Sequence, residues 1–188
     1  MRRYLSCICL SLCFLACQSP GQEATSSTSE APLYDYDVEE RIKELGITLP
    51  EAGSPVANYV NAVTTSSNLL FLAGKGPKQA DGTYITGKVG ADLTVEQGQE
   101  AARLTAIQQL AVLKAELGDL NRVKRIVKVV GMVNAVPDFT DQPEVVNGFS
   151  NLMVEVFGER GKHARAAVGM GSLPRGIAVE IDVVVEVE

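Results

Sequence analysis

The C-terminal segment, residues 177–188, restricts the possible folds more than any other part of this chain. An Ile or a Val occupies every odd position from Ile177 to Val187, whereas the even positions are mostly acidic and include Glu180 and Asp182. A repeat of two residues is the period of a β-strand whose faces meet different surroundings. One face must therefore cover a core, and the other is either solvated or paired against a second copy of the chain.

Two further segments have the repeat of an amphipathic helix. The first starts at the capping-box sequence Thr94-Val95-Glu96-Gln97 and ends at Gly118, and its apolar residues recur at spacings of four and three. The second runs from Val145 to a stop at Gly158. Strands are expected at 59–65, 69–73, 123–136 and 164–170, and a short helix at 37–46. This order predicts an α+β domain in which helices cover one face of a single sheet.

Composition excludes several classes of protein. Apolar residues make up 46% of the 188 residues, which is too many for a wholly disordered chain. The net charge of −6 argues against a nucleic-acid partner, which requires a basic face. The four cysteines lie at positions 7, 9, 13 and 17, and His163 is the only histidine. A globular part without cysteine has no disulfide, no cysteine nucleophile and no cysteine-ligated zinc, and we expect it to need no metal or cofactor.

The N-terminus is expected to be an export signal. Arg2 and Arg3 precede an uncharged, mostly apolar run from Tyr4 to Ala16, which is too short to span a membrane, since a spanning helix needs roughly 20 apolar residues. The run ends in Phe14-Leu15-Ala16-Cys17, which is similar to a bacterial lipoprotein box, although such boxes usually have Leu in place of Phe14. We expect cleavage before Cys17, lipidation of that residue, and an exported, membrane-anchored protein that is periplasmic or associated with the outer membrane. Soluble secretion and a retained anchor are the alternatives.

The rest of the chain is expected to divide into three parts. Residues 17–35 form a lipidated, flexible tether, because 18–31 is rich in Ser and Thr and contains no large apolar residue. Residues 36–54 form a short helical lead-in, and residues 55–188 form the main domain. Because no disulfide is available to it, this domain must be held by its core or by assembly with copies of itself.

Arg165 is the residue that most strongly suggests a binding site. It lies in the sequence His163-Ala164-Arg165-Ala166-Ala167, where small residues predict a strand. A guanidinium is always charged, and burying it unpaired costs several kcal/mol. Its planar fork fits a carboxylate in two-point contact. Two interpretations follow. Arg165 forms a structural ion pair with Glu180, or it holds the carboxylate of a small ligand while Glu180 positions a water molecule.

The same residues carry a resemblance to a known family. Arg165-Ala166-Ala167-Val168, then Leu173-Pro174, then Val179-Glu180-Ile181-Asp182 resemble the C-terminal signature of the Rid family, the reactive intermediate imine deaminases, which are also called endoribonuclease L-PSP-like. Further matches in the same order extend the resemblance over roughly residues 55–188: Tyr59-Val60, Phe71-Leu72-Ala73-Gly74, Asp119-Leu120 and Val146-Asn147. The loop residues 74–77 and 87–90 are similar to a divergent branch rather than to the core deaminase branch.

The resemblance implies a chorismate-mutase-like fold that assembles as a homotrimer with clefts between its subunits. In such a cleft, Arg165 would hold the substrate carboxylate and Glu180 would orient the attacking water. The cleft would be completed by Tyr59 and Asn147 and by the backbone at Gly74 and Ala167. The implied reaction is hydrolysis of a 2-imino acid, derived from an enamine, to a 2-keto acid and ammonia.

This reaction requires little from the protein. An imine carbon is already electrophilic, so orientation, a positioned water and a carboxylate that takes its proton suffice. Ala73 replaces a hydroxyl residue of the deaminase branch and Ala167 replaces a common Cys, which bears on the substrate range. The alternatives are a protein that binds a small carboxylate without turnover and a structural exported trimer. Ribonuclease activity is disfavoured, because phosphate binding needs positive charge and the net charge falls to −8 without Arg2 and Arg3.

Overall fold

The computed structural model of the chain describes residues 33–188. The expected signal at 1–16, the expected lipidation site Cys17 and the expected tether up to residue 32 lie outside the described residues. Within 33–188, no helix combines the length and the apolar composition needed to cross a membrane.

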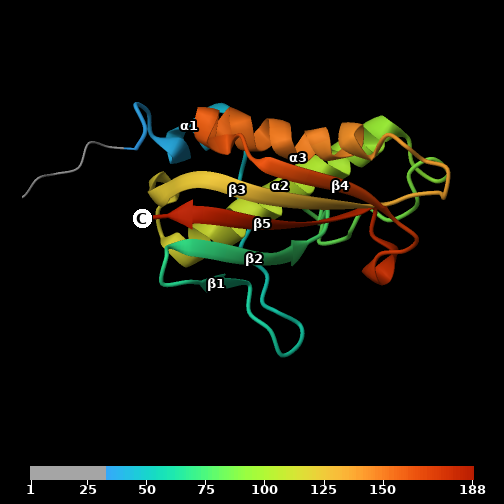
Figure 1. The fold of residues 1–188 in the computed structure, drawn as a ribbon, viewed down its shortest axis with the longest axis horizontal. Coiled ribbons are helices and arrows are strands. Elements are labelled where there is room, and N and C mark those ends of the chain that lie inside the picture. Colours follow the sequence, from blue (N-terminus) through green and yellow to red (C-terminus); the bar gives the residue numbers. More distant parts are fainter. Residues whose placement is uncertain (1–32) are drawn as a thin grey trace, which may run out of the picture. The chain divides into compact units, whose positions relative to one another are not determined.

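The described chain forms one five-stranded sheet (Figure 1). Its strands are β1 (Ala62–Thr64), β2 (Leu69–Lys75), β3 (Val123–Asn134), β4 (Ala164–Met170) and β5 (Val179–Val187). They lie in the order β1-β2-β5-β3-β4, and every neighbouring pair is antiparallel except β3 and β4, which are parallel. The C-terminal strand β5 therefore lies in the middle of the sheet.

The two faces of β5 differ as its sequence repeat predicts. Buried residues alternate with half-buried ones along the whole strand. Ile181 and Val185 are fully buried, whereas Glu180 and Asp182 point to the opposite face. The prediction of one apolar and one mostly acidic face is confirmed.

Two long helices cover the apolar face. Helix α2 (Val95–Leu117) lies against β2 and β5, and helix α3 (Gln142–Phe157) lies against β3 and β4. Thr94 and Gln97 form the predicted capping box of α2, and Gly118 ends that helix in the left-handed conformation. Helix α3 begins three residues earlier than its apolar repeat indicated, because Pro143 is favourable in a first helical turn. The predicted α+β architecture, with helices on one face, is confirmed.

Glycines allow α3 to approach its neighbours closely. A Cβ added at Gly131 of β3 would lie 2.5 Å from Val146 of α3. A Cβ added at Gly148 would lie 2.0 Å from the backbone oxygen of Gln99 in α2. These two positions therefore fix the spacing between α3, the sheet and α2, and with it the position of the α3 residues that face β4.

The N-terminal part of the described chain packs onto this core. Helix α1 (Val38–Glu44) buries Val38 and Ile42. Tyr34 is only 8% exposed and its phenol donates a hydrogen bond to the Val123 carbonyl. The predicted tether, residues 17–35, therefore does not extend as far as residue 35, because the aromatic ring of Tyr34 packs in the core.

The uncovered face of the sheet carries exposed apolar side chains beside its acidic residues. Phe71 is 46% exposed, and its cross-strand partners are Val63 on β1 and Val184 on β5. Val168 and Met170 of β4 are also exposed. Strand β1 is shorter than the predicted strand 59–65, because Tyr59 and Val60 lie in the exposed segment that leads into it.

Candidate functional site

A β-bulge in β2 creates the local geometry of the candidate site. Leu72 pairs with Val183 and Lys75 pairs with Ile181, so two residues of β2 face a single residue of β5. The extra residue lies at Ala73-Gly74. Bulges redirect side chains and are frequent beside active sites.

A buried glutamine holds this bulge in place. The side-chain amide of Gln109, from α2, donates to the Ala73 carbonyl at 3.0 Å and to the Ile181 carbonyl at 2.8 Å. These bonds satisfy backbone oxygens at the place where the regular ladder is interrupted. Gln109 is 1% exposed, so the bulge is tied rigidly to the helix layer.

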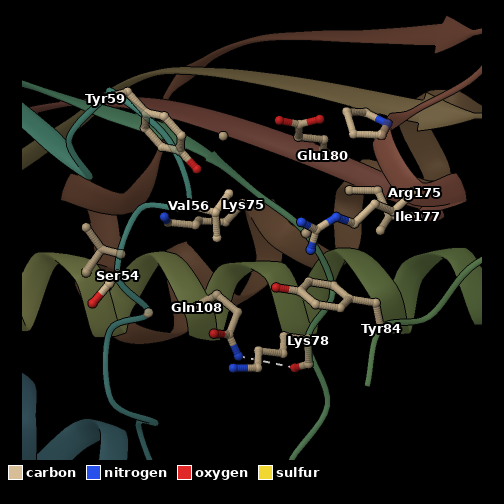
Figure 2. Close-up of a pocket in the computed structure, with 15 residues that line it drawn as sticks. Ser54, Val56, Tyr59, Lys75, Lys78, Tyr84, Gln108, Arg175, Ile177 and Glu180 are labelled. Carbon is tan, nitrogen blue, oxygen red and sulfur yellow. Dashed lines mark hydrogen bonds between the residues drawn. The ribbon is translucent and has the colours of Figure 1, made fainter. Parts of the chain in front are cut away.

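A pocket of about 360 Å³ lies at this end of β2 (Figure 2). Three of the residues that the sequence singled out line it: Tyr59, Gly74 and Glu180. Figure 2 shows the Tyr59 ring and the Glu180 carboxylate on the same side of the pocket. Its volume is in the usual range for small-molecule sites, about 300–1,000 Å³.

Glu180 is the carboxylate of this pocket. Partial burial raises its pKa above the ordinary value, and the negative charge of Asp182 raises it further. Among the described residues no cation forms an ion pair with it. The absence of a side chain at Gly74 gives the carboxylate its space, since a Cβ there would lie 2.5 Å from Glu180 Oε1.

Arg165 lies elsewhere, between β4 and α3. Its Nη1 donates to Asn147 Oδ1 at 2.9 Å and to Ser150 Oγ at 3.0 Å, and its Nη2 donates to the Pro143 carbonyl at 3.4 Å. All three acceptors are neutral. Within residues 33–188 the guanidinium has no carboxylate within ion-pair distance, so its charge is oriented but not neutralised.

The structure does not bring Arg165 and Glu180 together within one chain. Arg165 pairs across the sheet with Val129, which is fully buried under the helices. Glu180 pairs with Met132 of β3, and the side chains of Met132 and Val129 point to opposite faces of that strand. The two side chains therefore leave opposite faces of the sheet. Within one chain they therefore form no structural ion pair, because β3 separates their strands and the pleat turns them apart.

The predicted site residues thus form two groups. Tyr59, Gly74 and Glu180 line the pocket, whereas Asn147 contacts Arg165. Ala167 follows two residues after Arg165 on the same face of β4 and packs against the core. Neither Asn147 nor Ala167 lines the pocket of a single chain.

Sequence reasoning missed several residues of the pocket. They are Lys75 of β2, Tyr84 of a loop, Gln108 of α2 and Arg175 of the short 3-10 turn Pro174–Gly176. The Nζ of Lys75 donates to Asn61 Oδ1 at 2.7 Å, and burial lowers the pKa of this amine. The sequence indicates Lys75 only as a lysine in a Gly-rich loop, and no local sequence pattern indicates Tyr84, Gln108 or Arg175. No group of three or more His, Cys, Asp or Glu that could hold a metal ion occurs within 33–188.

A single mixed sheet with two helices on one face, and a carboxylate pocket beside a bulged strand, defines a chorismate-mutase-like α+β protein. Residues 39–181 match the family described as "YjgF/chorismate_mutase-like, putative endoribonuclease". The chain belongs to this family, and the resemblance to the Rid proteins is confirmed.

Several relatives share most of this chain. Protein TCP17 of Trypanosoma cruzi is 49% identical over 146 residues, which are 77% of this chain and 91% of that protein. The crystal structure of Atu1372 from Agrobacterium tumefaciens, a protein of unknown function, is 49% identical, covers 80% of this chain and 94% of its own, and has a TM-score of 0.73. A "putative endoribonuclease" from Shewanella oneidensis is 30% identical, covers 81% of this chain and all of its own, and has a TM-score of 0.77.

Proposed function

We propose that this protein hydrolyses small 2-imino acids, derived from enamines, to 2-keto acids and ammonia in clefts between the subunits of a homotrimer. One observation carries the proposal. Arg165 presents a charge without a carboxylate partner on one face of the sheet, and Glu180 presents a carboxylate without a cation on the other. Each group supplies what the other lacks, and only a second copy can place them around one ligand.

The proposed chemistry assigns a role to each group. Arg165, held by Asn147 and Ser150, binds the carboxylate of the imino acid. Glu180 accepts a proton from a water molecule whose oxygen attacks the imine carbon. The imine nitrogen is already protonated when the water attacks, so the addition product is a neutral amino alcohol. Glu180 passes its proton to the amine nitrogen, the C–N bond breaks, and Glu180 takes up the hydroxyl proton as the carbonyl of the keto acid forms. The released ammonia then removes that proton as ammonium, which restores the Glu180 carboxylate. The raised pKa of Glu180 suits this work, because a general base is most effective when its pKa approaches the working pH.

The uncovered sheet face supports the trimer. Phe71, Val63 and Val168 expose apolar surface on it, next to the half-buried Asp182. Loss of water raises the pKa of Asp182, which is the direction expected of an acid on a partly dry surface. Packing this face against other copies would bury the apolar side chains and bring the β4 edge of one copy near the pocket of the next.

Binding without turnover is the second candidate, favoured by the neutral hydrogen bonds that already hold Arg165 in one orientation. The two candidates differ at Glu180. Replacing Glu180 with Gln keeps the shape but removes the base, so turnover is lost in the first candidate and carboxylate affinity is retained in the second.

The test uses imino acids made in place by an amino-acid oxidase, with the release of keto acid followed in time. Wild-type protein should accelerate the release, and Arg165→Ala and Glu180→Gln should each remove the acceleration. Refolding the two variants together then tests the shared cleft. If Arg165 and Glu180 come from different copies, random assembly restores about one cleft in four.

A mixture as inactive as its components would contradict the inter-subunit cleft. A wild-type protein that accelerates nothing would contradict the enzyme. Light scattering on the same samples reports whether the protein is a trimer.

We also propose that the protein is an exported lipoprotein attached through Cys17. The support is the order of a basic start, an apolar run and a small residue before the cysteine in residues 1–17. Incorporation of labelled palmitate that disappears in Cys17→Ser would support this location, and equal labelling of both would contradict it.

A further inference from the structure

The pocket beside Glu180 has an excess of positive charge. Three cationic residues line it, Lys75, Lys78 and Arg175, against the single carboxylate of Glu180. None of the three is in an ion pair within the described chain. The whole chain is acidic, with a net charge of −6, so a cationic pocket opposes the general charge of the molecule.

Arg175 is held in place by the loop that carries it. The backbone of Arg175 has φ +56°, a left-handed conformation that is unfavourable for a residue with a side chain. The loop is fixed on both sides, since Leu173 and Ile177 are buried and Gly87 donates a backbone hydrogen bond to the Gly176 carbonyl. Strained residues of this kind concentrate at ligand sites, where the surrounding structure keeps them in position.

The guanidinium of Arg175 is directed toward the middle of the pocket. Figure 2 shows it between Glu180 and the Tyr84 phenol, and Lys75 lines the same pocket. The side chain of Lys75 is partly buried and donates one hydrogen bond, to Asn61. An exposed guanidinium with an unused fork, carried on an anchored loop and with lysines lining the same pocket, is a typical arrangement for binding an anion.

We propose that the substrate carries a second acidic group, which Arg175 binds with electrostatic support from Lys75 and Lys78. This rests on the proposed function, because the first carboxylate is then held by Arg165 of another copy. The pocket thereby selects imino acids with an acidic side chain over those of equal length with an apolar one. A pocket of about 360 Å³ has room for a five-carbon diacid.

The test compares two keto-acid products of equal chain length, 2-oxoglutarate and 2-oxopentanoate, by calorimetry with the full protein. The diacid should bind at least about tenfold more tightly, since a hydrogen bond between charged groups contributes more than a neutral one. The preference should shrink as salt is raised. Arg175→Asn, which tolerates the left-handed backbone, should remove most of it, and Arg175→Lys should keep part of it.

Lys75→Gln should reduce the preference as well, and Lys43→Gln provides its matched control. Lys43 lies on α1, is exposed, and is paired with Glu40, so the control makes the same change of charge away from the pocket. Equal binding of the two keto acids to the wild type, binding of neither, or a preference that survives in Arg175→Asn would overturn the proposal.

The proposed function and this inference can fail separately. If imines of both kinds are hydrolysed at the same rate, the deaminase stands and the second anion site falls. If no imine is hydrolysed but the diacid preference depends on Arg175, the anion site stands as a binding site and the deaminase falls.

Discussion

The replacement of Gly74 with alanine tests whether the position of the Glu180 carboxylate is essential. A Cβ at residue 74 would lie 2.5 Å from Glu180 Oε1, whereas ordinary contact begins at 3.4 Å. The carboxylate must therefore move by about 0.9 Å. Glu180 Oε1 is the end of a flexible side chain, so the fold can absorb the change at a cost of about 0.5–1.5 kcal/mol for a displaced rotamer.

The effect on catalysis should be much larger than the effect on stability. A misplacement of about 1 Å in an active site can cost about 10²-fold in rate. We expect kcat/KM for imine hydrolysis to fall about 10²-fold, while Tm changes by only a few degrees, about 2–4 °C per kcal/mol for a chain of this size. The assays are keto-acid release in the oxidase-coupled reaction and thermal unfolding followed by circular dichroism.

The control for this experiment is Gly171→Ala. Gly171 has open space around its Cβ position and does not line the pocket, so the same added methyl group should change neither readout. If Gly74→Ala retains full activity, the assignment of Glu180 as the base is refuted. If it unfolds the protein, the reasoning that the carboxylate gives way is refuted.

Two further predictions concern stability. Gly148→Ala should lower the free energy of unfolding by about 3 kcal/mol or more. The added carbon would lie 2.0 Å from the backbone oxygen of Gln99, and neither helix can move without loss of packing. Thermal or urea unfolding measures this change, and a value below about 1 kcal/mol would contradict the prediction. His163 should make stability fall as pH drops below about 6.5: burial, and then the charge of Arg165, lower its pKa in the folded protein, so the unfolded chain takes up the proton first. The contribution of His163 to stability is complete above its pKa in the unfolded chain, and it is lost as the pH falls toward its lower pKa in the folded protein. Urea titrations between pH 5 and 8 should therefore show that the unfolding free energy of the wild type falls more steeply on acidification than that of His163→Gln.

Much of the fold could be read from local patterns. The period of β5, the capping box at Thr94 and the stop at Gly118 each depend on residues near one another in the sequence. The predicted boundaries differ from the structure where packing sets the end of an element, as at Pro143 in α3 and at Tyr34, whose burial depends on contact with Val123.

The candidate site could be predicted only in part. Glu180, Gly74 and Tyr59 were found through the family resemblance, and the structure places them around one pocket. Lys75 was visible as a lysine in a Gly-rich loop but without a role, and Arg175 had no signal at all. The conformation of Arg175 is imposed by the anchored ends of its loop, which a sequence pattern does not display.

The amino-acid sequence by itself determined which elements form and which of their faces are apolar, because hydrophobic period and end-capping act over a few neighbouring residues. Only the tertiary structure decided that Arg165 and Glu180 lie on opposite faces of the sheet, that the bulge at Gly74 gives the carboxylate its space, and that three cations share a pocket with it. The physical reason is strand register. A shift of one residue between distant strands would send a side chain to the other face, and that register is set by contacts between segments far apart in the chain.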